Sequence, residues 1–212
     1  MEEQIKNIKL WLGRGSINIF GLPMSGKDTV GVKLAEAIGG KFLSSGIIVR
    51  ALEQSKQQNH TGEGKLMPSN VFYEWVLPYF EKNELLNYPL VLSSIGRWEG
   101  EENQVMSVAQ QSGHPIRAVI MLQLSEKDVV ERWEAAKLLN DRGLRADDAD
   151  PAIFQTRINE YREKTVPVLK HYQELGLLIP VKADAPRDQV FANVVEALDS
   201  FARRTGDITP EL

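Results

Sequence analysis

The chain has 212 residues, of which 25% are charged and 42% hydrophobic, and its formal net charge is -4. This composition predicts one soluble globular domain, and the weakly acidic balance argues against a general nucleic-acid binder. The lack of cysteine excludes disulfides, zinc–thiolate sites and thiol nucleophiles. No apolar run approaches the ~18 residues of a membrane span, and residues 1–15 lack the pattern of a secretory signal. We therefore expect a cytoplasmic monomer with no membrane or nucleic-acid partner.

Short apolar runs alternate with segments of helical periodicity after an amphipathic arm at residues 1–15. The apolar runs predict strands at 17–21, 41–44, 89–93, 118–124 and 177–182. The periodic segments predict helices at 27–38, 47–58, 70–82, 100–112, 125–139, 151–175 and 186–203. Ser69 and Ser125 stand at N-cap positions, and Asp128 completes a capping box with Ser125. Pro78 is expected to kink or shorten its helix, and Pro167 to kink its own.

The order of these elements predicts the fold class. Strands that alternate with helices form a parallel sheet covered by helices on both faces, and ligands then lie beyond the carboxyl ends of the strands. The run at 118–124 is too apolar for an exposed edge and predicts a central strand. We expect one α/β domain over residues 16–205, preceded by the arm and followed by a tail at 206–212.

The most specific motif runs from Gly21 to Thr29 and reads Gly-Leu-Pro-Met-Ser-Gly-Lys-Asp-Thr. Its G-x-x-x-x-G-K spacing lies between a predicted strand and a predicted helix, which is the context of a phosphate-binding P-loop. The two glycines let backbone N–H groups point at an anion, and the helix N-terminus adds partial positive charge. Lys27 would reach the outer phosphates of a nucleotide, while Asp28 stands where such loops carry Ser or Thr for Mg²⁺.

Arginines gather at the same rim of the predicted sheet. Arginine binds phosphate through two parallel hydrogen bonds and stays charged, which suits a site for phosphoryl transfer. The arginines near predicted strand ends, or in the loops after them, are Arg50, Arg97, Arg132, Arg142, Arg145 and Arg157. In an acidic protein, this placement beside a P-loop predicts an anion site.

The order and spacing of several motifs resemble the adenylate kinases and related nucleoside monophosphate kinases over residues 17–200. The P-loop looks like their G-x-P-G-x-G-K-G-T. The other similar segments are 44–51 (S-T-G-D-x-x-R-A), 64–68 (G-x-L-V-P), 93–97 (D-G-F-P-R), 131–133 (E-R-L), 145–148 (R-x-D-D) and 157–161 (R-L-x-x-Y). The resemblance implies a P-loop NTPase-type three-layer α/β/α fold with a five-stranded parallel sheet. It also implies a helical monophosphate-binding insertion at 45–80 and a short lid at 137–150.

The resemblance further implies transfer of a phosphoryl group from ATP to a nucleoside monophosphate, foremost AMP, with Mg²⁺ as cofactor. Catalytic roles fall on Lys27, Arg97, Arg132, Arg145 and Arg157. ATP contacts fall on Gly21, Pro23, Met24, Ser25, Gly26, Lys27, Asp28, Thr29 and Arg132. Monophosphate contacts fall on Ser45, Gly46, Arg50, Lys65, Leu66, Met67, Arg97, Gln104, Arg145 and Arg157.

The chain departs from the family pattern at several of these positions. Ser93 replaces the aspartate that holds water on Mg²⁺, and Met24 and Asp28 replace glycines. Glu101 replaces the glutamine that reads adenine, with Gln104 nearby. The other departures are Ile47, in place of the aspartate after Ser-Gly, and Ala136, in place of a lid arginine.

These departures leave two functions open. One is a working kinase in which Asp28 takes over the carboxylate role near Mg²⁺, although Asp28 would also suit the first turn of its helix as an acidic capping residue. The other is a nucleotide-binding protein of kinase ancestry with little or no turnover. The base is open too: Ser45 stands where adenylate kinases have Thr and pyrimidine-specific relatives have Ala, so UMP and CMP are alternative acceptors.

Overall fold

The computed structural model describes residues 1–139 and 150–206. Five parallel strands form one sheet in the order β2-β3-β1-β4-β5. Their bounds are β1 Ser16–Gly21, β2 Lys41–Ser44, β3 Leu90–Ser93, β4 Ile116–Gln123 and β5 Leu178–Lys182. The predicted five-stranded parallel sheet is confirmed. The apolar strand β4 is interior, as expected, but β1 holds the middle of the sheet.

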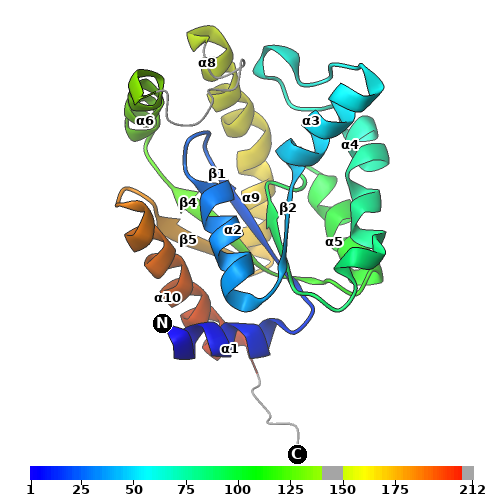
Figure 1. Cartoon of the computed structure of the whole chain (residues 1–212), viewed down its shortest axis with the longest axis vertical. Helices are drawn as coiled ribbons and strands as arrows, with labels where there is room; N and C mark the ends of the chain where they lie inside the picture. Colours follow the sequence, from blue (N-terminus) through cyan, green and yellow to red (C-terminus); the bar gives the residue numbers. More distant parts are fainter. Residues whose placement is uncertain (140–149, 207–212) are drawn as a thin grey trace, which may run out of the picture.

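Helices cover both faces of the sheet (Figure 1). Ile17 and Ile19 of β1 pack with α2 (Lys27–Ile38), α10 (Arg187–Thr205) and the arm helix α1 (Glu2–Leu12). Phe20 of β1 points to the other face, where it meets Tyr172 of α9 (Val166–Glu174). Side chains that alternate along this buried strand thus contact the helical layers on both faces of the sheet. Helix α1 lies at the end of the molecule opposite α6 and α8 (Figure 1).

The remaining helices follow the predicted pattern with shifted ends. They are α3 Ser45–Lys56, α4 Ser69–Trp75, α5 Glu101–Gln111, α6 Glu126–Leu139 and α8 Pro151–Glu160. Ser125 and Asp128 form the predicted capping box, with the Asp128 N–H donating to Ser125 Oγ at 3.1 Å. The predicted helix 151–175 contains a π turn, Tyr161–Thr165, just before Pro167, so the ladder absorbs the missing proline N–H without breaking.

The predicted helix 70–82 is wrong beyond its first two turns. It ends at Trp75, and 3₁₀ turns at Leu77–Glu81 and Asn83–Leu85 follow, because Pro78 removes a helical N–H. The predicted Ser69 cap is also wrong, since Pro68 occupies the N-cap position and Ser69 Oγ donates to Glu101 instead. No helix within the described ranges is long and apolar enough to cross a membrane.

Candidate active site

The P-loop backbone takes the expected course between β1 and α2. Gly26 caps α2 in the left-handed region at φ 85°, and a Cβ on Gly21 would lie 2.5 Å from Ser25 Oγ. Both positions therefore require glycine. Met24, at the family's glycine position, also takes a left-handed φ of 62°. The loop keeps a glycine-type conformation there at a cost in backbone strain.

Two cavities flank the first turn of α2. The cavity beside α3, here the α3 cavity, is lined by Lys27 and Asp28, and the cavity beside α10, here the α10 cavity, by Ser25, Gly26 and Thr29. One turn of chain thus contributes to both sites.

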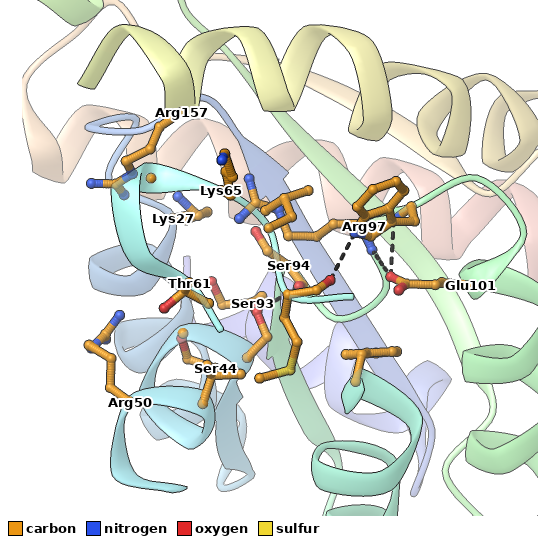
Figure 2. Close-up of a pocket in the computed structure, with 18 of the residues that line it drawn as sticks. Lys27, Ser44, Arg50, Thr61, Lys65, Ser93, Ser94, Arg97, Glu101 and Arg157 are labelled. Atoms are coloured by element: carbon orange, nitrogen blue, oxygen red, sulfur yellow. Dashed lines mark hydrogen bonds between the residues drawn. The ribbon is translucent and has the colours of Figure 1, made fainter. Parts of the chain in front are cut away.

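Basic side chains from distant parts of the chain line the α3 cavity. Figure 2 shows Arg50 on α3, Lys65 on the loop above it, Arg97 after β3 and Arg157 on α8, together with Lys27. Ser45, Gly46, Leu66 and Met67 line the same cavity. The structure therefore gathers most of the predicted monophosphate residues around one cavity.

One predicted monophosphate residue does not line this cavity, and another lies outside the described residues. Gln104 lies exposed on α5 and is not among the residues that line it. Glu101, one turn earlier on the same helix, does line it and is 2% exposed. Arg145 lies outside the described residues, as do Arg142 and most of the predicted lid.

A backbone hydrogen bond to Glu101 fixes the position of Arg97, and its side chain is largely buried beside the cavity. The Arg97 and Trp98 N–H groups donate to Glu101 at 2.7 and 3.0 Å, and two residues before Arg97 the Ile95 carbonyl accepts from Asn18 at 2.7 Å. Within the described ranges, the buried Arg97 Nε has no hydrogen-bond partner. A buried guanidinium donor that faces a cavity is suited to an incoming anion.

Burial lowers the pKa of Arg97 to about 10, and electrostatic interactions with Tyr161, Glu160, Glu101 and Asp28 oppose that drop. Arg97 thus stays charged at neutral pH. Burial is also the largest effect on Glu101, and it raises the pKa of that carboxyl although three donated hydrogen bonds pull the other way.

Asp28 is hydrogen-bonded to Ser93, the residue that replaces the family's aspartate. Ser93 Oγ donates to Asp28 Oδ1 at 2.5 Å, and both residues line the α3 cavity. The acidic side chain of this pair therefore stands at residue 28, where the family has glycine, and not at residue 93. A carboxylate oxygen remains at the floor of the cavity even though residue 93 is not acidic.

The α10 cavity combines the P-loop with the helix that ends the fold. Arg132 of α6 donates to the carbonyls of Ala183 and Met24, so it spans the loop after β5 and the P-loop. Phe191, Pro186 and Ala185 supply apolar lining, and Lys33 and Asp188 pair at its rim at 2.7 Å. An apolar wall with a guanidinium across from it suits a planar base next to its phosphates.

Sequence reasoning missed several lining residues. Thr61 and Phe72 in the α3 cavity and Lys33 and Phe191 in the α10 cavity carried no motif, and Glu101 stood out only as a departure from the family's glutamine. Trp98 also lines the α3 cavity. Trp133 stacks on Phe154 with ring centroids 4.8 Å apart.

The parallel sheet, the P-loop and the two cavities define a P-loop nucleotide kinase, that is, a phosphotransferase. The chain is 31% identical to an adenylate kinase of Mycobacterium tuberculosis over 191 residues, covering 85% of this chain and 97% of that one. It is 28% identical to an adenylate kinase of Chlamydia muridarum, covering 85% of each. The chain therefore belongs to the adenylate kinase family, as a divergent member.

The fold has a further match among solved structures. A gluconokinase from Sinorhizobium meliloti 1021 superposes with a TM-score of 0.59 at 18% identity, covering 90% of this chain and 95% of that one. At this identity the match supports the P-loop kinase fold and nothing finer. No protein-family model matches the chain.

Proposed function

We propose that this protein transfers the γ-phosphoryl group of ATP reversibly to a nucleoside monophosphate, with AMP as the acceptor. The observation that carries the proposal is the pair of cavities that share the first turn of α2, one of them lined by five basic side chains that include Lys27. Such a pair accommodates two nucleotides with their phosphates facing each other. The names of the adenylate kinases that the chain resembles support AMP.

In this proposal ATP occupies the α10 cavity. The P-loop backbone from Gly21 to Gly26 and the N-terminus of α2 hold its phosphates, Thr29 lines the same cavity, and Arg132 lies beside the base. The monophosphate occupies the α3 cavity, where Arg50, Arg97 and Arg157 neutralise its charge.

Transfer then needs positioning and positive charge more than covalent chemistry. A phosphate oxygen of the monophosphate attacks the γ-phosphorus, the bond from that phosphorus to the β,γ-bridging oxygen breaks, and ADP leaves. Lys27, Arg97 and Arg157 stabilise the charge on the moving group. Arg145 keeps a predicted role in this step, although it lies outside the described residues.

Asp28 is the residue proposed to hold Mg²⁺ beside the phosphates. Among residues 1–139 and 150–206 no group of three or more acidic or histidine side chains could hold a metal. Mg²⁺ usually takes one or two carboxylates plus substrate phosphates, so Asp28 with the Ser93 hydroxyl fits as a donor set. When bound, the ion would neutralise the phosphate charge that Asp28 otherwise repels.

The Asp28→Asn variant tests this role, because the amide keeps the shape and removes the charge. We expect it to raise the Mg²⁺ concentration needed for turnover and to weaken Mg·ATP binding, with metal-free ATP binding not weakened. Titrations of ATP with Mg²⁺ and with a chelator measure both quantities. An unchanged Mg²⁺ dependence would leave Asp28 only the role of an acidic residue in the first turn of α2.

A second candidate function is nucleotide binding with little or no turnover. The neutral Ser93 at the family's aspartate position favours it. A further candidate is a kinase for UMP or CMP, which Ser45 leaves open because this cavity residue stands where adenylate kinases have Thr and pyrimidine-specific relatives have Ala. A coupled assay of the purified chain with ATP and AMP, CMP or UMP decides among the three. AMP as the best acceptor supports our proposal, and no ADP from any acceptor supports the binding protein.

A further inference from the structure

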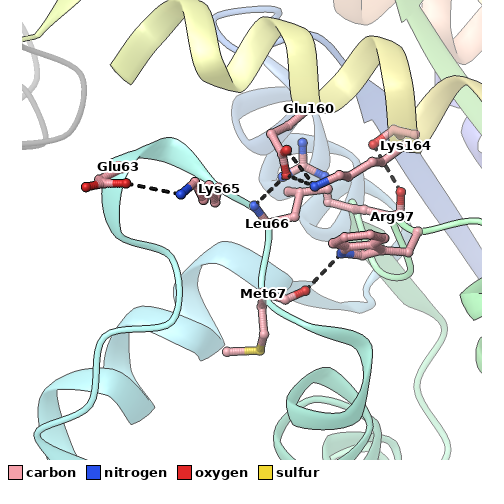
Figure 3. A network of polar contacts seen from close by, with 9 residues as sticks. Glu63, Lys65, Leu66, Met67, Arg97, Glu160 and Lys164 are labelled. Atoms are coloured by element: carbon pink, nitrogen blue, oxygen red, sulfur yellow. Dashed lines mark hydrogen bonds and ion pairs between the residues drawn. The ribbon is translucent and has the colours of Figure 1, made fainter. Parts of the chain in front are cut away.

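The segment from residue 62 to 68, here the covering segment, lies over the α3 cavity and is fastened at two backbone atoms. The Leu66 N–H donates to Glu160 Oε2 on α8 at 2.9 Å, and the Met67 carbonyl accepts from Trp98 Nε1 at 2.9 Å (Figure 3). Its residues Gly64, Lys65, Leu66 and Met67 line the cavity. Two other elements therefore hold the cover in place.

Lys164 joins those two fastenings to each other. Its ammonium lies 2.6 and 2.7 Å from the two carboxylate oxygens of Glu160 and 3.9 Å from the centre of the Trp98 ring (Figure 3). The side chains of Lys164 and Glu160 are only 23% and 12% exposed, so water screens these contacts less than a surface pair. The covering segment, Trp98, Lys164 and Glu160 thus form a closed ring of contacts, here the contact ring.

Gly64 provides separate evidence that the cover is built to approach α8 closely. It has a left-handed φ of 79°, and a Cβ on it would lie 2.6 Å from the Ile153 carbonyl oxygen. Only glycine fits both the conformation and the distance. The contact is therefore a specific feature of the sequence rather than a loose packing of a loop on a helix.

The contact ring also includes backbone next to two arginines of the cavity. Arg97 directly precedes Trp98, and its carbonyl accepts from Thr165 Oγ1 at 3.3 Å. Arg157 lies about one turn before Glu160 on α8. Lys164 and Thr165 both belong to the π turn, a rare element that is common at functional sites. Moving the ring would therefore move both arginines relative to the cavity.

We propose that Trp98 and Lys164 are positioning residues for the phosphate acceptor: they hold the covering segment closed and keep Arg97 and Arg157 aligned on the α3 cavity. The proposal rests on the proposed function, since it assumes that the α3 cavity takes the nucleoside monophosphate. Neither side chain reacts. Their effect is confined to the acceptor, because no member of the ring lines the α10 cavity.

Steady-state kinetics of Trp98→Phe and Lys164→Met test the proposal. The phenylalanine keeps an aromatic ring under Lys164 and loses the indole N–H that donates to the Met67 carbonyl. We expect the KM for AMP to rise about three- to tenfold in Trp98→Phe, the range of one neutral hydrogen bond. In Lys164→Met we expect a rise of at least the same size, because Glu160 loses its counter-ion. The KM for ATP should stay within about twofold in both, since a residue that positions one substrate leaves uniform binding of the other unchanged.

Two further variants separate positioning from general damage. Lys164→Arg should recover most of the AMP affinity, because a guanidinium both stacks on indole and pairs with a carboxylate. Lys170→Met removes the same charge from an exposed site on α9 and should change neither constant. The double variant should raise the KM for AMP by less than the product of the two single effects, since both residues act in one ring.

The proposal is overturned if the KM for AMP is unchanged in both single variants, or if the constants for AMP and ATP rise together. Its failure is distinct from failure of the proposed function, which would show as a wild-type chain that forms no ADP. In that case amide hydrogen exchange still decides: the Leu66 N–H should exchange faster in Trp98→Phe than in the wild type, and equal rates would overturn the ring.

Discussion

The α10 cavity and the α3 cavity share one turn of helix α2 but draw on the chain in different ways. Most of the phosphate-facing wall of the α10 cavity comes from the continuous P-loop, and its rim pair of Lys33 and Asp188 is largely exposed. The α3 cavity is assembled from α3, the covering segment, the loop after β3, and α8. Hydrogen bonds between segments far apart in the chain, rather than the local sequence, set the shape of the α3 cavity.

This difference explains where the chain departs from its family. The P-loop accepts Met24 in a left-handed conformation because the strand and helix on either side fix its ends. In the α3 cavity, Ser93 stands at the family's aspartate position and donates a hydrogen bond to Asp28, which stands at a glycine position. A locally built site tolerates strain, whereas an assembled site can hold its carboxylate on a neighbouring element.

The largest effect is expected from Lys27→Ala, which removes the P-loop cation from the α3 cavity, on the turn of α2 that the two cavities share. Turnover should fall by at least about a hundredfold, the usual cost of losing a preorganised group that stabilises transition-state charge. Far-UV circular dichroism should be unchanged, because the backbone conformation of the loop depends on its glycines. Activity within about tenfold of the wild type would show that Lys27 does not stabilise the transferred phosphoryl group.

The next effect separates the two cavities directly. Arg97→Ala and Arg50→Ala should weaken AMP binding about tenfold or more, as expected for hydrogen bonds to a charged group, and weaken ATP binding far less. Arg132→Ala should show the reverse order, since Arg132 lines only the α10 cavity. Calorimetric titration of both ligands into each variant gives the ratios. Equal losses of AMP and ATP affinity in Arg97→Ala would contradict the assignment of acceptor and donor sides.

A smaller effect is expected on stability from the left-handed conformation at Met24. Met24→Gly should unfold at higher urea than Met24→Ala, with a difference of about 1 kcal/mol, because glycine adopts this φ without the steric cost of a Cβ. Comparing the two small residues cancels the loss of the Met24 side chain from its cluster with Trp133. A Met24→Ala variant as stable as Met24→Gly would mean that the loop relaxes.

The smallest effect concerns the pH dependence of stability through Glu101. Burial raises the pKa of this carboxyl above its unfolded value. The folded state therefore holds a proton over a range in which the unfolded state has lost it, and stability falls as pH rises through the folded pKa. Glu101→Gln should remove that part of the fall between acidic and neutral pH. Urea unfolding of both proteins across that range is the measurement, and parallel curves would contradict the prediction.

The elements with strong local signals could be predicted from the sequence almost to the residue. Helix α2 and strand β2 have the predicted bounds, since Gly26, Gly39 and Gly40 mark where the chain turns. The error at 70–82 has a different origin. Ser69 carries the local signal of a cap, but its hydroxyl donates to Glu101, thirty-two residues away in the chain, and a long-range partner of that kind leaves no local pattern.

The amino-acid sequence by itself determined the order of strands and helices, the P-loop and the arginines that reach one rim, because periodicity, glycine positions and motif spacing are properties of neighbouring residues. Only the tertiary structure decided which side chains meet there. Parallel pairing brings β3 beside β1 and so Ser93 against Asp28, and the packing of α8 on the covering segment brings Lys164 over Trp98. Such contacts depend on three-dimensional distance between segments far apart in the chain, which spacing along the sequence does not encode.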